Sequence, residues 1–242
     1  MRKLQNWNFF VDIDGTITDY LPGVLAPERL LAGNFLFPLI QQKIAVVKGI
    51  DLQEAETLIL KECERNVFWC YGDFVRHFSL PEEEMFESFR RWHRESLSVY
   101  QDTVELLKVL SDAGAGIFII SNNPVDGCVL KLERAGFSRT FFKNIFGTDL
   151  VRGCKFSPDS WHRAIALSGV PVETIRVIGD DPHEDGSIPL SCGCRGSFIL
   201  TRSAVETARQ QGDVVQVNNA MEIARCLLQK DDIFIRSGVR MA

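Results

Sequence analysis

The sequence predicts an α/β fold, in which a doubly wound and mostly parallel sheet carries helices on both faces. Two observations predict the sheet: short apolar runs rich in β-branched and aromatic residues recur along the chain, and amphipathic segments separate them after residue 100. A third observation predicts an inserted helical module, because residues 20–98 show helical periodicity and few strand-like runs. Right-handed crossovers between parallel strands bring their carboxyl ends to one edge of the sheet.

Composition indicates a globular protein. The 242 residues suffice to bury a core, and the hydrophobic share of 45% and charged share of 24% are near globular averages. A formal net charge of −5 argues against broad attraction to nucleic acid or to an anionic membrane. No segment reaches the roughly 18 uninterrupted apolar residues of a membrane span, and none resembles a signal peptide. Seven scattered cysteines, an odd number, favour a reducing cytoplasm.

The first strand and its carboxyl end define the candidate site. Residues 9–13 form an apolar run that predicts a buried strand, with Asp12 and Asp14 at its end, before a Gly-Thr turn. Open parallel sheets bind ligands at this edge, so two carboxylates there are expected to attract a cation. A calcium loop is excluded because the twelfth position counted from Asp12 is Gly23 and not Glu.

The inserted segment is expected to form three helices, over residues 38–47, 52–66 and 82–97. Asp51 and Glu54 match a capping box for the second helix. Eight aromatic residues are expected to pack these helices together: Phe68, Trp69, Tyr71, Phe74, Phe78, Phe86, Phe89 and Trp92. The predicted division is therefore a sheet-bearing part of residues 1–19 and 99–242 and an inserted helical module of residues 20–98.

Strands and helices alternate after residue 100. The expected helices run from Asp102, with Glu105 completing a cap, to Gly114, then Pro124 to Gly136, Ser157 to Gly169 and Ala220 to Gln229, with a further helix opened by Ser203 and Glu206. The expected strands cover residues 116–120, 144–146, 175–178, 197–200 and 214–217. The tail, residues 231–242, has no interpretable pattern.

Further polar turns are expected at the same sheet edge as the first two acids. One follows the strand over 116–120, one precedes a helix, and one follows the strand over 175–178. Carboxylates suit a hard cation, whereas a hydroxyl, amides and an ammonium suit phosphate oxygens, so the set predicts phosphoryl transfer. The candidate residues are Asp12, Asp14, Ser121, Asn122, Lys155, Asp180, Glu184 and Asp185.

These motifs resemble those of the haloacid dehalogenase superfamily, in its magnesium-dependent phosphatase branch with an inserted helical cap, which includes phosphoglycolate phosphatases and β-phosphoglucomutase-like enzymes. The first family motif, Asp-x-Asp-Gly-Thr after an apolar strand, stands at residues 12–16. The second, an apolar strand ending in Ser or Thr and then usually Asn, is matched by Ser121 and Asn122. The resemblance covers roughly residues 7–220 and implies a Rossmann-like catalytic core.

The third and fourth family motifs follow in the expected order. The third is a lysine ahead of a helix, usually followed by proline, and here Lys155 is followed by Phe156, which departs from the pattern. The fourth is a Gly-Asp pair followed by a second acid. Asp180 occupies the first acidic position, with Asp185 as the second acid and Glu184 as the competing choice.

The resemblance implies a two-step hydrolysis. Asp12 would attack the substrate phosphorus and form an aspartyl-phosphate, and Asp14 would protonate the leaving-group oxygen and then deprotonate the attacking water. Ser121 and the amide near Asn122 would bind phosphoryl oxygens, and Lys155 would offset the negative charge. Dehalogenases of this superfamily lack the second acid, so Asp14 argues against carbon–halogen chemistry.

The resemblance also implies Mg²⁺ as the cofactor. The carboxylate of Asp12, the main-chain carbonyl of Asp14 and the carboxylate of Asp180 would hold the ion, with Asp185 acting through a water.

The expected function is magnesium-dependent hydrolysis of a phosphate monoester of a small soluble metabolite in the cytoplasm. We expect no nucleic-acid or membrane partner, and a monomer or a homodimer. One alternative is a sugar-phosphate mutase that uses the same site residues, and another is a low-turnover binding or regulatory protein of the same fold. Specificity in such enzymes depends on cap side chains, whose orientation periodicity alone does not give.

Overall fold

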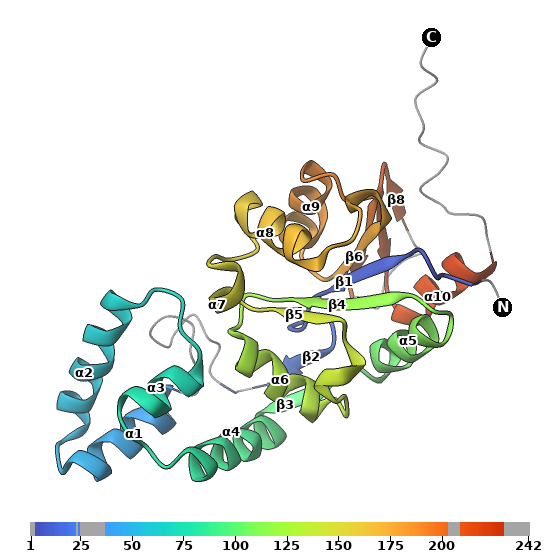
Figure 1. Cartoon of the computed structure of the whole chain (residues 1–242). Coiled ribbons are helices and arrows are strands. Elements are labelled where there is room, and N and C mark those ends of the chain that lie inside the picture. The colour runs from blue at the N-terminus through green and yellow to red at the C-terminus, as the bar shows by residue number, and fades with distance from the viewer. Residues whose placement is uncertain (1–2, 23, 25–36, 203–208, 230–242) are drawn as a thin grey trace.

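A seven-stranded sheet forms the centre of the molecule in a computed structural model that describes residues 3–22, 24, 37–202 and 209–229. In sheet order the strands are β5 (Asn144–Phe146), β4 (Gly116–Ile120), β1 (Asn8–Val11), β6 (Ile175–Gly179), β7 (Gly196–Leu200), β9 (Val214–Val217) and β8 (Arg209–Gln211). The first six are parallel, and β8 pairs antiparallel with β9 at the edge. The predicted α/β, Rossmann-like fold is confirmed (Figure 1). The edge strand β8 was not expected.

Helices cover both faces of this sheet. In the sheet-bearing part of the chain they are α5 (Gln101–Asp112), α6 (Val125–Arg134), α7 (Thr148–Val151), α8 (Pro158–Ser168), α9 (Ile188–Ser191) and α10 (Ala220–Gln229). Short turns of other helix types lie at Arg139–Phe141 and Val172–Thr174, and at η5 (Pro182–Ser187), a π-type turn.

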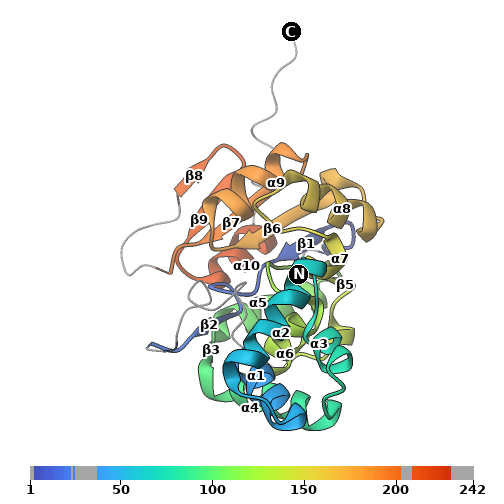
Figure 2. The ribbon, with the colours of Figure 1, turned by 90° about the vertical axis from the view of Figure 1, so that its left-hand side faces the viewer.

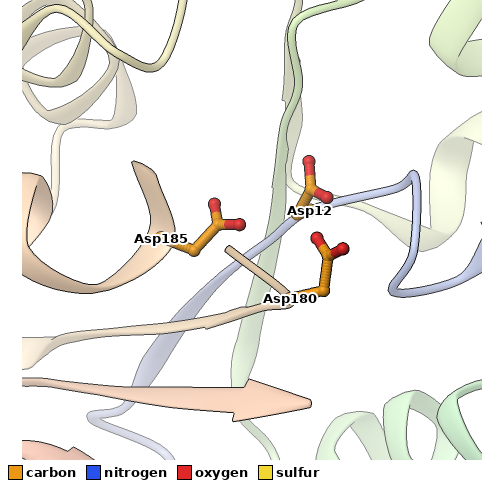
Figure 3. Close-up of side chains that lie close together, drawn as sticks. All are labelled: Asp12, Asp180 and Asp185. Carbon is orange, nitrogen blue, oxygen red and sulfur yellow. The ribbon is translucent and has the colours of Figure 1, made fainter. Parts of the chain in front are cut away.

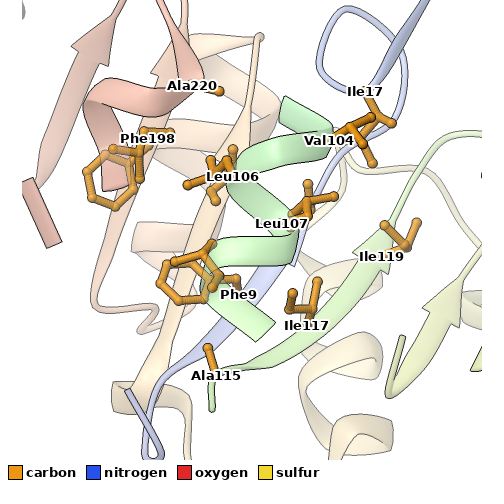
Figure 4. Close-up of a cluster of buried hydrophobic side chains, with 14 of the residues drawn as sticks. Phe9, Ile17, Val104, Leu106, Leu107, Ala115, Ile117, Ile119, Phe198 and Ala220 are labelled. Carbon is orange, nitrogen blue, oxygen red and sulfur yellow. The ribbon is translucent and has the colours of Figure 1, made fainter. Parts of the chain in front are cut away.

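The central strand β1 supplies Phe9 and Val11 to one hydrophobic cluster and Phe10 to another. Successive side chains of a strand point to opposite faces, so Phe9 and Phe10 are buried on different sides of the sheet. Phe9 packs with residues of α5, α6 and α10, among them Leu106 and Leu107 (Figure 4). Phe10 packs with α8 and α9, and its ring centroid lies 6.4 Å from that of Trp161. A strand buried on both faces requires a continuous apolar run, which explains the sequence pattern.

In its described residues, the inserted segment contains four helices: α1 (Phe37–Lys48), α2 (Leu52–Arg65), α3 (Tyr71–His77) and α4 (Glu82–Ser96). They surround a separate cluster of buried side chains, and they lie together beside the sheet in both overall views (Figures 1 and 2). The predicted packing role of the aromatic residues is confirmed for most of them. The rings of Trp69 and Phe74, for example, meet edge to face with their centroids 4.1 Å apart. The capping box of Asp51 and Glu54 is also confirmed. Helix α3 was not expected.

A two-stranded antiparallel ribbon joins this helical segment to the rest of the chain. Strand β2 (Thr18–Tyr20) leaves the first motif, and β3 (Leu97–Val99) returns from α4, with Asp19 opposite Ser98. Neither strand was predicted from the sequence. The proposed boundaries at residues 19 and 99 fall inside this ribbon, and the division into core and cap stays a prediction.

One expected helix cap is wrong. Asp102 lies inside the first turn of α5, and its carboxylate accepts hydrogen bonds from Arg202 and from the backbone N–H of Ala220. These long-range partners take the place of the local cap that was expected between Asp102 and Glu105. The helix expected from Ser203 and Glu206 and the tail at 231–242 lie outside the described residues. No helix in the described part of the chain is long and apolar enough to cross a membrane.

Candidate active site

Asp12 follows β1 directly and lies at the carboxyl end of the central strand. Its backbone N–H donates to the carbonyl oxygen of Ile178 at 2.9 Å, which continues the sheet ladder one residue beyond the strand. The side chain is only 3% exposed, and its Oδ1 lies 2.6 Å from Nζ of Lys155. Burial raises the pKa of Asp12 well above its usual value, and Lys155 acts in the opposite direction. Asp12 therefore needs a neighbouring cation to remain ionised.

Lys155 provides that cation. Its ammonium contacts two carboxylates, with Nζ 2.6 Å from Oδ1 of Asp12 and 2.8 Å from Oδ1 of Asp185. Burial alone would lower the pKa of Lys155, but the two carboxylates raise it above its ordinary value. The loop is fixed on both sides of this residue: the Lys155 N–H donates to Oδ1 of Asn122 at 2.7 Å, and its carbonyl accepts from the indole N–H of Trp161 at 3.0 Å.

Three carboxylates converge beside Lys155. Figure 3 shows the side chains of Asp12, Asp180 and Asp185 close together, and one carboxylate oxygen of each lies within 4.8 Å of the others. In the part of the chain that the structure describes, no other group of acids, histidines and cysteines is placed in this way. Asp180 is the solvent-exposed member. Burial and the charge of Asp185 raise the pKa of Asp180 to about 6. Oxygen ligands at this spacing suit a hard divalent cation.

The two candidate acids after Asp180 have different surroundings. The side chain of Asp181 accepts from the backbone N–H groups of His183 and Glu184 and opens η5. This turn directs Asp185 inward, where it is fully buried, whereas Glu184 accepts a hydrogen bond from Nδ2 of Asn122 at 2.7 Å. Thus Asp185, and not Glu184, joins the carboxylate cluster.

Asp14 is placed differently from the other acids. Its side chain is 37% exposed, and its two oxygens accept from Nζ of Lys131 at 2.6 and 2.8 Å. Oδ2 also accepts from Nδ2 of Asn123 at 2.7 Å. Neither partner was predicted. Asn123 follows the second motif directly and could have been included with it, whereas Lys131 lies in an ordinary amphipathic helix and carries no sequence pattern of its own.

The second motif provides a buried hydroxyl group. Ser121 is 2% exposed, its N–H donates to the carbonyl of Phe146 at 3.0 Å, and its Oγ accepts from Nδ2 of Asn123 at 2.9 Å. The side chain of Asn122 instead bridges the loops of Glu184 and Lys155. Asn122 therefore holds together two loops of the site through its side chain, and substrate binding by the amide near it stays a prediction.

The turn after Asp14 is held by a residue from a distant part of the chain. Gly15 has a φ of +72°, and a Cβ added there would overlap the carboxylate of Asp180. Arg202 donates through Nη2 to the carbonyl of Thr16 at 2.8 Å and through Nη1 to Asp102 at 2.8 Å. Arg202 was not among the predicted site residues, because a contact across this much of the chain leaves no local pattern in the sequence.

Comparison with known proteins finds one family. The model of a family described as "Hydrolase: haloacid dehalogenase-like hydrolase" matches residues 8–187, which is more than half of the chain. No match is found among curated proteins.

Several solved structures have a similar fold. A HAD phosphatase from Thermococcus onnurineus aligns with a TM-score of 0.54 and 23% identity over 94% of this chain and 98% of its own. A 2-haloacid dehalogenase from Pseudomonas syringae pv. Tomato DC3000 aligns with a TM-score of 0.56 and 15% identity over 95% of this chain and 99% of its own. CbbY from Rhodobacter sphaeroides, solved in complex with phosphate, aligns with a TM-score of 0.53 and 16% identity over 89% of this chain and 95% of its own. At these identities the structures share the fold.

Proposed function

The chain belongs to the haloacid dehalogenase-like hydrolase family, and on that basis we propose that it hydrolyses the phosphate monoester of a small metabolite with Mg²⁺ as cofactor. The observation that carries the proposal is the contact of the Lys155 ammonium with Asp12 beside the carboxylates of Asp180 and Asp185. A nucleophilic carboxylate next to a fixed cation suits attack on a phosphoryl group.

The residues present fit Mg²⁺. Oxygens of Asp12, Asp180 and Asp185 lie within 4.8 Å of one another, and the missing side chain at Gly15 leaves room for the carboxylate of Asp180. These oxygens are the ligand type that Mg²⁺ prefers, and the main-chain carbonyl of Asp14 is a further proposed ligand. When bound, the ion would neutralise part of the charge of the phosphoryl group.

In the proposed first step, a carboxylate oxygen of Asp12 forms a bond to phosphorus while the bond from phosphorus to the leaving-group oxygen breaks. Lys155 offsets the negative charge that Asp12 and the phosphoryl oxygens bring together. The hydroxyl of Ser121 and the backbone near Asn122 hold the phosphoryl oxygens. The product of this step is an aspartyl-phosphate on Asp12.

Asp14 supplies the proton transfers in this proposal. Its carboxyl group gives a proton to the leaving-group oxygen as the bond to phosphorus breaks. It then takes a proton from the water that attacks the aspartyl-phosphate, which releases inorganic phosphate and restores Asp12. A half-exposed carboxylate next to the buried cluster is suited to both transfers, because it can reach groups that enter from solvent.

Asp14 also separates this proposal from dehalogenation. A halide ion leaves without a proton, whereas the oxygen of a phosphate ester is a strong base that needs one. The similarity to the Pseudomonas dehalogenase, at 15% identity, concerns the fold alone.

The proposal includes the setting of the reaction. We place the enzyme in the cytoplasm, as a monomer or a homodimer, without a nucleic-acid or membrane partner. The net charge of −5 argues against a nucleic-acid or anionic membrane partner, and the odd number of cysteines favours a reducing cytoplasm.

Phosphate release from p-nitrophenyl phosphate in the presence of Mg²⁺ tests the proposal. We expect magnesium-dependent release that the variant Asp12→Asn abolishes and the control Asp112→Asn, at an exposed position of α5, retains. Absence of release, or equal release by Asp12→Asn, would contradict the assignment and favour a binding or regulatory protein. A screen of phosphorylated metabolites then identifies the substrate class, and product analysis on hexose phosphates distinguishes hydrolysis from mutase activity.

A further inference from the structure

Lys131 is a buried lysine on α6 that no sequence motif includes. Its side chain is 0% exposed, and its ammonium lies 2.6 Å from Oδ1 and 2.8 Å from Oδ2 of Asp14. We propose that Lys131 is a positioning residue for Asp14, and that it holds the carboxyl group where it protonates the leaving-group oxygen. This inference rests on the proposed phosphatase function and names a residue that the function does not itself require.

The burial of this ammonium calls for an explanation. A lysine taken out of water loses its hydration unless a partner replaces it, and apolar residues are the usual occupants of such buried positions. The apolar neighbours of Lys131 on α6 include Leu130 and Leu132, which belong to two different hydrophobic clusters. A leucine or methionine would therefore suit position 131 as core. The ammonium is placed instead against a carboxylate of the candidate active site.

Two donors, Lys131 and Asn123, hold the carboxylate of Asp14. Lys131 engages both oxygens, and Asn123 donates to Oδ2 at 2.7 Å and to Oγ of Ser121 at 2.9 Å. The acid is thereby linked to the hydroxyl that is proposed to bind the phosphoryl group. Asp14 nevertheless remains 37% exposed, so a substrate can reach it. Such an arrangement fixes the orientation of a proton donor without covering it.

The ribbon between the sheet and the inserted helices also contributes to the environment of Lys131. Its Nζ lies 5.0 Å from the ring centroid of Tyr20 on β2, a distance at which a cation is attracted to an aromatic face. Helix α6 also packs against α4 of the inserted segment. Lys131 thus lies between Asp14 and the connection to the inserted helices, and the ring of Tyr20 limits the directions in which its ammonium can move.

A purely structural ion pair is the alternative, and the two roles predict different kinetics. A structural role changes stability and affects all substrates equally. A positioning role affects proton transfer to the leaving-group oxygen, because the bond from phosphorus to that oxygen breaks as Asp14 gives up its proton. The loss on removing Lys131 must then grow with the basicity of the leaving group. Phenolate is a stronger base than p-nitrophenolate, and the two aryl phosphates have similar size.

The test compares kcat/KM of Lys131→Met on phenyl phosphate and on p-nitrophenyl phosphate, both with Mg²⁺. This parameter reports the steps up to aspartyl-phosphate formation and is insensitive to its later hydrolysis. We expect the kcat/KM of the variant to fall about tenfold more on phenyl phosphate than on p-nitrophenyl phosphate. The control Lys108→Met, at an exposed position of α5, is expected to show a small and equal fall in kcat/KM on both aryl phosphates.

A double-mutant cycle with Asp14→Asn adds a second readout. If Lys131 acts through Asp14, the substitution Lys131→Met has no further effect on the ratio of the two kcat/KM values once Asp14 is replaced. Equal losses on both substrates, or the same change of the ratio with and without Asp14, would overturn the inference.

Two further results keep the test decisive. If Lys131→Met does not fold, as judged by circular dichroism, Lys131→Arg keeps the charge but displaces it, and we expect the same direction of selectivity; equal losses would again overturn the inference. If the unmodified protein hydrolyses neither aryl phosphate with Mg²⁺, the proposed function fails, and the role of Lys131 fails with it. That outcome is distinct from an active protein whose Lys131 variants lose equally on both substrates.

Discussion

The backbone of Gly15 lies against the carboxylate of Asp180, so closely that a Cβ on Gly15 would overlap Oδ2 of Asp180. The first motif therefore leaves space for the acid of the fourth. The substitution Gly15→Ala is expected to displace Asp180 and to weaken the apparent affinity for Mg²⁺ by about 10- to 100-fold, the usual effect of disturbing groups around a metal site. Activity measured over a range of Mg²⁺ concentrations gives this affinity.

A matched control separates this effect from backbone strain. Gly136 also has a positive φ, +83°, but nothing lies within 4 Å of the position where its Cβ would be. Gly136→Ala is expected to lose about 1 kcal/mol of unfolding free energy and to keep the affinity for Mg²⁺. If Gly15→Ala also keeps that affinity, the contact with Asp180 does not matter for metal binding.

The stability of the metal-free protein is expected to depend on Asp180 through pH. Burial and the charge of Asp185 raise the pKa of Asp180 to about 6 from the usual value of 3.8. The folded protein therefore holds this proton more tightly than the unfolded chain, and the contribution of Asp180 to stability falls as the pH rises from about 4 to about 6. Asp180→Asn lacks this effect. Its stability relative to the unmodified protein should rise over that range, as measured by urea unfolding with a chelator present.

Mg²⁺ should reverse this dependence. Protons compete with the metal ion for the carboxylate, so added Mg²⁺ is expected to raise the midpoint of thermal unfolding at pH 7 and to have little effect at pH 4 to 5. Asp180→Asn should show a much smaller shift at pH 7. An equal shift for the variant and the unmodified protein would mean that the ion binds elsewhere.

Substitutions of Asp185 and of Glu184 are expected to have different effects, although both residues are candidates for the second acid of the fourth motif. Asp185 is fully buried and contacts Lys155, whereas Glu184 makes a hydrogen bond to the exposed Asn122. Asp185→Asn is expected to lower kcat/KM by about 10- to 100-fold. Glu184→Gln should lower it by less than about tenfold, because the substitution alters a single exposed hydrogen bond. A larger loss for Glu184→Gln would assign the second acid of the motif to Glu184.

The sequence predicted those parts of the site that local patterns encode. The apolar run at residues 9–13 indicated the central strand, and parallel crossovers then placed the later polar turns at its carboxyl end. Asp185 could not be separated from Glu184, because a π-type turn decides which side chain points inward, and the sequence pattern does not distinguish this turn from an α-helical one.

The parts that sequence analysis missed depend on contacts between distant segments. The ribbon of β2 and β3 joins two short segments that are far apart in the chain, so neither shows strand periodicity by itself. Asp102 matched a helix cap locally, but Arg202 and Ala220 hold its carboxylate instead. Long-range charge pairing competes with local capping, and no pattern around Asp102 shows which prevails.

Arg202 is expected to support the site from outside it. Its guanidinium donates to both oxygens of Asp102, at 2.8 and 2.9 Å, to the carbonyl of Thr16 and to Oγ1 of Thr103, and it stacks on the ring of Tyr100. The turn after Asp14 thus depends on a planar group that presents several donors at once. Arg202→Met is expected to cost about 2 kcal/mol of unfolding free energy, since it removes charge-assisted hydrogen bonds to partly buried partners.

Arg202→Lys distinguishes geometry from charge. An ammonium keeps the positive charge but cannot bridge Asp102 and the carbonyl of Thr16 with the planar fork of donors, so this variant should be nearly as destabilised as Arg202→Met. Both variants are also expected to need more Mg²⁺ for half-maximal activity, because the loosened turn carries the main-chain carbonyl of Asp14. Arg65→Met, an exposed position on α2, is the control and should change neither quantity. Full stability of Arg202→Lys would show that charge alone holds the turn, and an unchanged Mg²⁺ requirement would show that the turn does not position the proposed metal ligand, the carbonyl of Asp14.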